Sequence, residues 1–167
     1  DNGLVWAAAE GECLTWMNTK VDGKPVAQRA GYAVEIEALW YNAVCYTLAL
    51  ARKYKDKEFV ERWADMPAKT KKSFIEKFWL GEEYLADYVN DYEVNKFRRS
   101  NMLVALGLDY TMLNEEQTMD VLGVVRRHLL TPRGVRSLSP LNPFYEPSYA
   151  EDQRSQDLAS RNGSAWI

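Results

Sequence analysis

The chain has 167 residues, of which 47% are hydrophobic, 13% aromatic and 27% charged, and its formal net charge is −3. This length fits one domain with a sizeable core, and the weak negative charge gives no electrostatic reason to expect nucleic acid or an anionic membrane as partner. No stretch approaches the roughly 18 uncharged apolar residues that span a bilayer, and the N-terminus lacks the basic and apolar run of a signal peptide. Two cysteines make neither a disulfide framework nor a zinc pattern, and one histidine excludes most histidine-based metal sites and Ser-His triads. We therefore expect a cytoplasmic globular protein.

The first half of the chain changes character near residue 32. Residues 1–31 are dense in glycine and predict a loop-dominated segment, the kind of region that often carries function. Residues 33–54 contain neither glycine nor proline and predict a helix that is apolar nearly all round, which indicates burial among other helices. Residues 57–79 predict a second helical stretch, interrupted or restarted at Pro67, with an apolar stripe beside a face of lysines.

Shorter elements follow in the second half. Residues 84–89 fit a short hairpin element, and residues 101–112 fit a third helix. Asn114 is a good N-cap for a fourth helix, because Gln117 stands three residues later in the capping-box position. Residues 131–134 contain proline and glycine and end that helix.

This order of elements predicts an all-α fold, because helical stretches are separated by long loops with no alternation of strand and helix. We expect one partial domain over residues 1–167, with a loop-rich segment at 1–31, helical hairpins at 32–134 and a second loop-rich segment at 135–167. The abrupt apolar end of the sequence indicates truncation. Missing neighbours would leave sides of the helix at 33–54 uncovered, which favours self-association.

Three clusters combine aromatic with hydrogen-bonding side chains, at residues 14–20, 35–42 and 98–101. Aromatic faces stack on the apolar faces of sugar rings, and amides, carboxylates and guanidinium groups pair with hydroxyls, so the clusters predict sugar binding. Two carboxylates across such a pocket would permit glycoside hydrolysis. The clusters contain no metal or phosphate pattern, so we expect no metal site in them.

Two positions in these clusters leave alternatives open. Glu35 and Glu37 lie about 200° apart around a helix and cannot both face one ligand. Glu35 shares its face with Asn42, so one acid is a candidate site carboxylate while the other pairs with a lysine or arginine. Trp40 lies on an apolar helix, where packing in the core is a better interpretation than stacking on a ligand.

Several longer motifs together cover nearly the whole chain. They are Thr15-Trp16-Met17-Asn18-Thr19-Lys20, residues 29–43, Ser73-Phe74 with Phe78-Trp79, Arg99-Ser100-Asn101, residues 130–140 and Asn162-Gly163-Ser164-Ala165-Trp166. These motifs resemble the C-terminal domain of glycogen debranching enzymes, an amylo-α-1,6-glucosidase. The resemblance implies a truncated part of an (α/α)6 toroid that hydrolyses α-1,6-linked glucose in glycogen or another branched α-glucan, by acid–base catalysis with water and without a cofactor.

The same resemblance implies roles for particular residues. The substrate-binding residues would be Trp16, Lys20, Trp40, Asn42, Arg99 and Asn101. The family's general acid follows the Trp-Met pair, where this chain has Asn18, and an amide cannot deliver a proton to a leaving oxygen. Glu35 is the remaining acid candidate, and the family's base lies beyond this sequence, so we expect the chain alone to be inactive.

Further departures from the family pattern are Ser100 and Met102 in place of Pro and Gln, Glu37 in place of Asn, and Arg161 in place of His. A non-catalytic helical module that binds glucan or a partner is the alternative function, and a scaffold whose aromatics all lie in the core is a third. The carbohydrate interpretation requires Trp16, Glu35 and Arg99 to converge around a common hollow.

Overall fold

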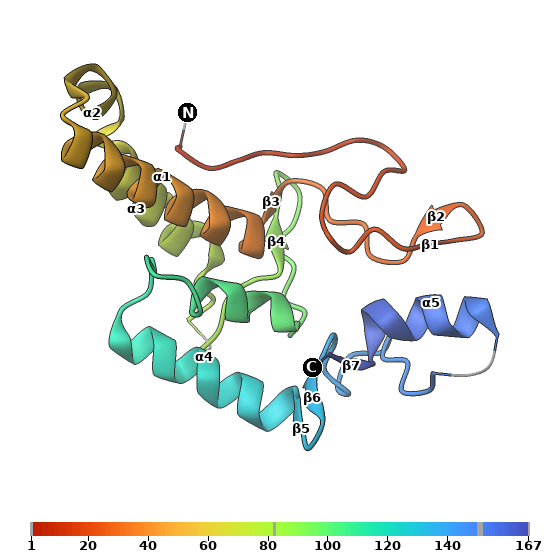
Figure 1. The fold of residues 1–167 in the computed structure, drawn as a ribbon. Coiled ribbons are helices and arrows are strands. Elements are labelled where there is room, and N and C mark those ends of the chain that lie inside the picture. Colours follow the sequence, from red (N-terminus) through yellow and green to blue (C-terminus); the bar gives the residue numbers. More distant parts are fainter. Residues whose placement is uncertain (1, 82, 150–151, 167) are drawn as a thin grey trace.

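The computed structural model describes residues 2–81, 83–149 and 152–166 (Figure 1). Its helices are α1 (Val34–Tyr54), α2 (Lys57–Trp63), α3 (Met66–Phe78), the 3-10 helix η1 (Ser100–Ala105), α4 (Glu115–His128) and α5 (Gln153–Asn162). Its strands are β1 (Lys20–Val21), β2 (Lys24–Pro25), β3 (Tyr32–Ala33), β4 (Tyr88–Val89), β5 (Leu130–Thr131), β6 (Gly134–Arg136) and β7 (Ala165–Trp166). None of the helices among these residues is long and apolar enough to cross a membrane.

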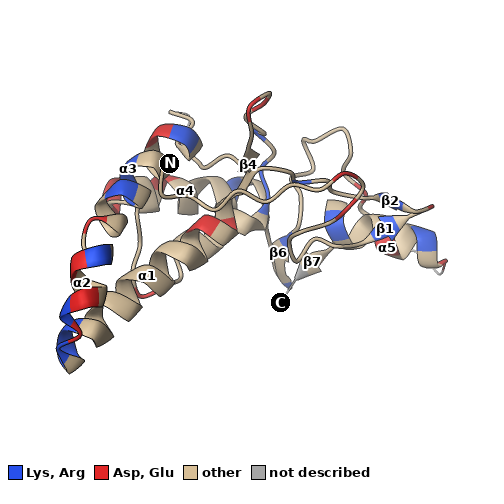
Figure 2. Cartoon of the chain, turned by 90° about the horizontal axis from the view of Figure 1, so that it is seen from above, with Lys and Arg blue, Asp and Glu red and all other residues tan. Residues whose placement is uncertain are grey.

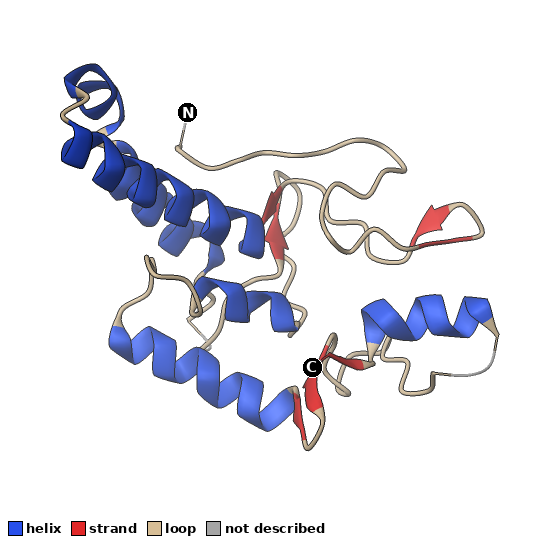
Figure 3. Ribbon diagram, viewed as in Figure 1, coloured by secondary structure: helices blue, strands red, loops and turns tan. Residues whose placement is uncertain are grey.

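The expectation of an all-α fold, as part of an (α/α)6 toroid, is wrong. The structure is mixed α/β, with 44% helix and 12% in short antiparallel strands that form three small sheets (Figure 3). Each strand is only two or three residues long. Strands this short cannot show the alternation of apolar and polar residues by which a sequence reveals a strand, so the helical pattern dominated the prediction.

The strands connect segments that are distant in the sequence. β3 pairs with β4 in the register Tyr32↔Val89 and Ala33↔Tyr88, which brings the start of α1 beside the segment that follows α3. β6 lies between β5 and β7 and pairs with β7 at Val135↔Trp166, so the chain after α5 returns to the end of α4. β1 and β2 form a separate hairpin.

The two long helices α1 and α4 occur where the sequence predicts them. α1 begins one residue after the expected start and ends at Tyr54, followed by Lys55 in the left-handed region at φ 61°. α4 has the expected capping box: Asn114 Oδ1 accepts from the Gln117 amide at 2.8 Å, and Gln117 Oε1 accepts from the Asn114 amide at 3.1 Å. The capping residues lie within one helical turn of the helix end, so the sequence alone can predict them without knowledge of the tertiary structure.

The stretch at 57–79 divides into α2 and α3 just before Pro67, which stands in the first turn of α3. Proline is accepted there because the first amides of a helix have no intrahelical partner. Lys69, Lys71 and Lys72 are exposed, and Figure 2 shows basic residues on α3, as the lysine face predicts.

Two elements differ from the predictions for residues 101–112 and 135–167. The third helix is only the six-residue η1, whose last turn closes with the Gly107 amide donating to the Leu103 carbonyl at 3.1 Å. Glycine in a helix interior costs about 1 kcal/mol, which favours ending the helix here. α5 begins inside the expected loop, where Asp152 caps it by accepting from the Ser155 amide at 2.9 Å.

The main core lies between α1, α3, η1 and α4. Its fully buried members include Val34, Phe74, Phe78, Val121 and Leu129. The outer side of α1 is not covered, since Leu39 and Tyr46 are 49% and 55% exposed. α1 is therefore buried among other elements only in part, and some of its apolar side chains remain exposed.

The N-terminal segment runs along α1 (Figure 1). The Gly3 carbonyl accepts hydrogen bonds from Trp40 Nε1 on α1 at 3.0 Å and from Thr70 Oγ1 on α3 at 2.9 Å. Farther along, Ala7 and Gly31 exchange two backbone hydrogen bonds at 2.8 and 3.1 Å. The segment thus reaches the loop that precedes β3.

Candidate functional site

A buried group of charged side chains lies where the N-terminal loops meet β4 and η1. We name it the Asp87 cluster; its members, Arg29, Glu35, Asp87, Arg99 and Asn101, are each at most 5% exposed. Arg29 binds both acids with its guanidinium fork, donating to Asp87 Oδ2 at 2.9 Å and to Glu35 Oε2 at 2.6 Å. A second Arg29 nitrogen donates to Glu35 Oε1, so that pair is bidentate.

The β3–β4 pairing assembles this cluster. Glu35 lies in the first turn of α1, directly after β3, and Asp87 lies directly before β4. The Asp87 carbonyl accepts from the Val34 amide at 3.1 Å, which fixes the start of α1 beside the acid. Gly31 stands at φ 119°, where a side chain would collide with the Val89 carbonyl, so the sharp turn after Arg29 requires glycine.

Asp87 is the centre of the cluster because its two oxygens serve three side chains. Oδ1 accepts from Asn101 at 2.8 Å and from Arg29 at 3.0 Å, and Oδ2 lies 2.9 Å from Arg29 Nε and 3.5 Å from Arg99 Nε. The two guanidinium groups and the two carboxylates, Glu35 and Asp87, cancel in formal charge. Burial lowers the pKa of Arg29, but the two acids outweigh it and raise that pKa above its ordinary value.

Trp16 joins the Asp87 cluster to the surface. Its indole Nε1 donates to Asn101 Oδ1 at 3.0 Å while the residue remains 40% exposed. The Arg161 guanidinium lies 5.1 Å from the centre of the indole, and Arg161 also donates to Asn18 Oδ1 at 3.5 Å. We name Trp16, Asn18 and Arg161 the Trp16 edge.

The structure therefore brings together several of the residues singled out from the sequence. Glu35 and Arg99 both belong to the Asp87 cluster, and Trp16 attaches to it through Asn101. Glu35 lies 2% exposed and engages Arg29 through both oxygens, so it offers no free carboxylate to a ligand.

Lys20 and Asn42 make other contacts. Lys20 pairs with Glu12 at 3.0 Å beside the β1–β2 hairpin. Asn42 Oδ1 accepts from the Tyr110 amide at 3.0 Å and so ties α1 to the loop after η1.

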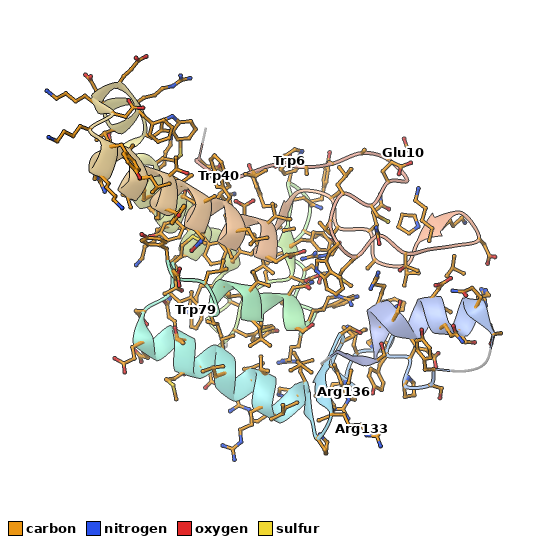
Figure 4. All side chains as sticks on the ribbon, viewed as in Figure 1. Trp6, Glu10, Trp40, Trp79, Arg133 and Arg136 are labelled. Carbon is orange, nitrogen blue, oxygen red and sulfur yellow. The ribbon has the colours of Figure 1, made fainter. Side chains whose placement is uncertain are left out.

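Trp40 packs away from the Asp87 cluster, farther along α1 (Figure 4). Its Nε1 holds the Gly3 carbonyl at 3.0 Å, and its ring meets Trp63 edge-on at 6.0 Å. These contacts agree with the interpretation that Trp40 packs within the protein and does not stack on a ligand.

Glu37 faces the N-terminal segment instead of the cluster. It is fully buried, and both of its oxygens accept from the Val5 amide at 3.1 Å. Burial raises its pKa to about 7, while the hydrogen bond from Val5 acts in the opposite direction. The two acids of α1 thus serve different segments.

Arg29 and Asp87 were not singled out from the sequence, and Arg161 was named only as a departure from the family pattern. Buried acids need a cation, which the sequence does show, but the partner of Glu35 could only be identified once β3 and β4 were paired. Arg161 reaches Trp16 from the end of α5, a helix that the sequence did not predict.

Within the described residues, no group of three or more His, Cys, Asp or Glu side chains could hold a metal ion. No curated protein matches the chain. A family model described as Amylo-alpha-1,6-glucosidase matches residues 1–167. The chain thus belongs to the amylo-α-1,6-glucosidase family, a family of glycoside hydrolases.

Proposed function

We propose that this chain supplies a glucan-binding surface to an amylo-α-1,6-glucosidase that hydrolyses α-1,6-linked glucose at the branches of glycogen-like glucans, by acid–base catalysis with water. The Trp16 edge is the contact with the sugar. The observation that carries the proposal is the Trp16 indole, which is 40% exposed yet fixed through Nε1 to the buried Asn101.

A fixed, exposed aromatic ring suits carbohydrate binding for two reasons. The apolar face of a pyranose covers the indole, and a ring that is already held loses little conformational freedom when the sugar binds. Asn18 is bound by Arg161, whose guanidinium lies over the ring, and the two carry the amide and guanidinium groups that pair with hydroxyls.

Binding without turnover is expected of the chain by itself. Asn18 has no proton to donate as an acid, and the acids of the Asp87 cluster are both engaged by Arg29. Glu37 is buried against the Val5 amide. A binding module with no chemistry of its own is therefore the second candidate function, and Asn18 is the observation that favours it.

Calorimetric titration with maltooligosaccharides and with α-1,6-branched oligosaccharides tests the proposal. Trp16→Ala should weaken binding about tenfold, in line with the loss of one stacked aromatic ring. Trp6→Ala is the matched control, because Trp6 is 45% exposed but packs edge-on against Tyr32 at 5.0 Å, on the N-terminal segment (Figure 4). Equal affinities for both variants, or no binding by the unmodified chain, would refute the proposal.

A further inference from the structure

A pocket of about 180 Å³ opens against the Asp87 cluster. Arg29, Asp87 and Arg99 form its floor, and its walls come from the loop before β3, from the segment after β4 and from Phe144. Among the described residues, those of the Trp16 edge do not line it. The same buried cluster therefore supports two different surfaces.

Aromatic rings form one wall of this pocket. Phe97 and Phe144 lie with their ring centres 6.1 Å apart and their planes tilted by 49°. The Arg99 guanidinium lies 5.9 Å from the Phe97 ring and holds it from the cluster side. Phe144 is 63% exposed, so an apolar face remains open to a ligand.

Side-chain amides supply the polar part of the lining. Asn95 Oδ1 accepts from the Phe97 amide at 3.1 Å, and Asn162 Oδ1 accepts from Arg99 at 3.0 Å, so both amide groups have a fixed orientation. Gln28 adds an exposed amide at the pocket. Such groups can both donate to and accept from hydroxyls.

The floor selects against charged ligands. Its two arginines are matched by Asp87 and Glu35, so an anion gains no uncompensated cation and would also meet the Asp87 carboxylate. The volume is below the roughly 300–1,000 Å³ of pockets that enclose drug-sized ligands, which favours a single ring.

We propose that this pocket binds one neutral pyranose ring and is a second sugar subsite, separate from the Trp16 edge. The ring stacks on Phe144 and Phe97, and its hydroxyls bind the amides of Gln28, Asn95 and Asn162. This subsite rests on the proposed glucan-binding function, because a glucan is the ligand that presents such rings.

The test uses glucose as the probe, with saturation-transfer NMR on the Trp16→Ala chain, so that the Trp16 edge does not contribute. Glucose should still bind this variant. Adding Phe144→Ala should weaken the affinity about tenfold, whereas adding Tyr149→Ala should not change it. Tyr149 is a matched control because it is 64% exposed on the same loop and does not line the pocket. Glucuronate and glucosamine, which carry a charge on the same ring, should bind more weakly than glucose.

Three results would overturn the subsite: no glucose binding to Trp16→Ala, equal affinity in the Phe144→Ala and Tyr149→Ala variants, or tighter binding of glucuronate than of glucose. Any of them leaves the proposed function standing if Trp16→Ala still weakens binding of oligosaccharides. Conversely, if the single variant Phe144→Ala loses oligosaccharide binding while Trp16→Ala does not, the subsite stands and the role of the Trp16 edge is refuted.

Discussion

Asp87 positions the Trp16 ring without contacting it. Its carboxylate orients Asn101, because the amide nitrogen that donates to Asp87 leaves the amide oxygen facing the Trp16 indole. It also holds Arg29, which in turn engages Glu35. The exposed Trp16 ring is therefore positioned by a carboxylate two hydrogen bonds away.

Asp87→Asn should destabilise the fold by roughly 3–5 kcal/mol, because it leaves two buried guanidinium groups facing one carboxylate. The measurement is the free energy of unfolding in urea. Asp91→Asn is the control, since Asp91 lies exposed on the same segment and its loss should cost less than about 0.5 kcal/mol. A cost for Asp87→Asn as small as that of the control would contradict the central role of Asp87.

Glu37 predicts a pH dependence of stability. Its folded-state pKa of about 7 exceeds the ordinary value of 4.5, so between these values the folded chain binds more protons than the unfolded one. Stability from this group is thus fully present below about pH 4.5 and is lost as the pH rises through 7, by roughly 3 kcal/mol.

Glu37→Gln retains an oxygen for the Val5 amide but carries no charge, so it should remove this part of the pH dependence. Urea unfolding at pH 5 and pH 8 measures the effect. The variant should be more stable than the unmodified chain at pH 8, and the advantage should shrink at pH 5. An advantage that is the same at both pH values would mean that Glu37 does not titrate in this range.

At the scale of elements, the sequence predicts helices whose limits depend on nearby residues, and it misses strands that depend on pairing between distant segments. α1 and α4 are long, and their limits are set by residues within one turn of their ends, so they were confirmed. The two-residue strands form because distant segments meet: Tyr32 pairs with Val89, a contact that no local pattern encodes. α5 was missed because it has few apolar residues and its burial is limited to positions such as Ala159 and Asn162.

The capping box of α4 predicts that removal of its N-cap side chain lowers the stability of the fold. Asn114→Ala removes the oxygen that accepts from the Gln117 amide and should cost about 1 kcal/mol of stability. Glu116→Ala, at an exposed first-turn position without a capping bond, should cost less than half as much. Thermal unfolding of the two variants makes the comparison, and equal shifts would show that the box does not stabilise the helix.

At the scale of the whole molecule, the candidate site is a product of topology. Its residues come from five separate segments, around residues 16–18, 29–35, 87, 99–101 and 161, and the β3–β4 pairing, η1 and α5 bring them together. The sequence identified Trp16, Glu35, Arg99 and Asn101 by residue type and by resemblance to a family. It did not identify Asp87 as their common contact, because an acid that directly precedes a two-residue strand carries no local sign of its partners.

The arrangement of acids across the molecule predicts that the purified chain releases no glucose from a branched dextrin. Asn18 occupies the position that the family resemblance assigns to the general acid, and Arg161 Nη2 lies 3.5 Å from its side-chain oxygen. Asn18→Asp alone should not restore turnover, since the neighbouring guanidinium lowers the pKa of an introduced carboxyl and keeps it ionised. A coupled enzymatic assay for glucose measures both proteins. Release by the unmodified chain would show that one of its buried acids becomes available to substrate, and release by Asn18→Asp alone would show that Arg161 does not suppress proton donation.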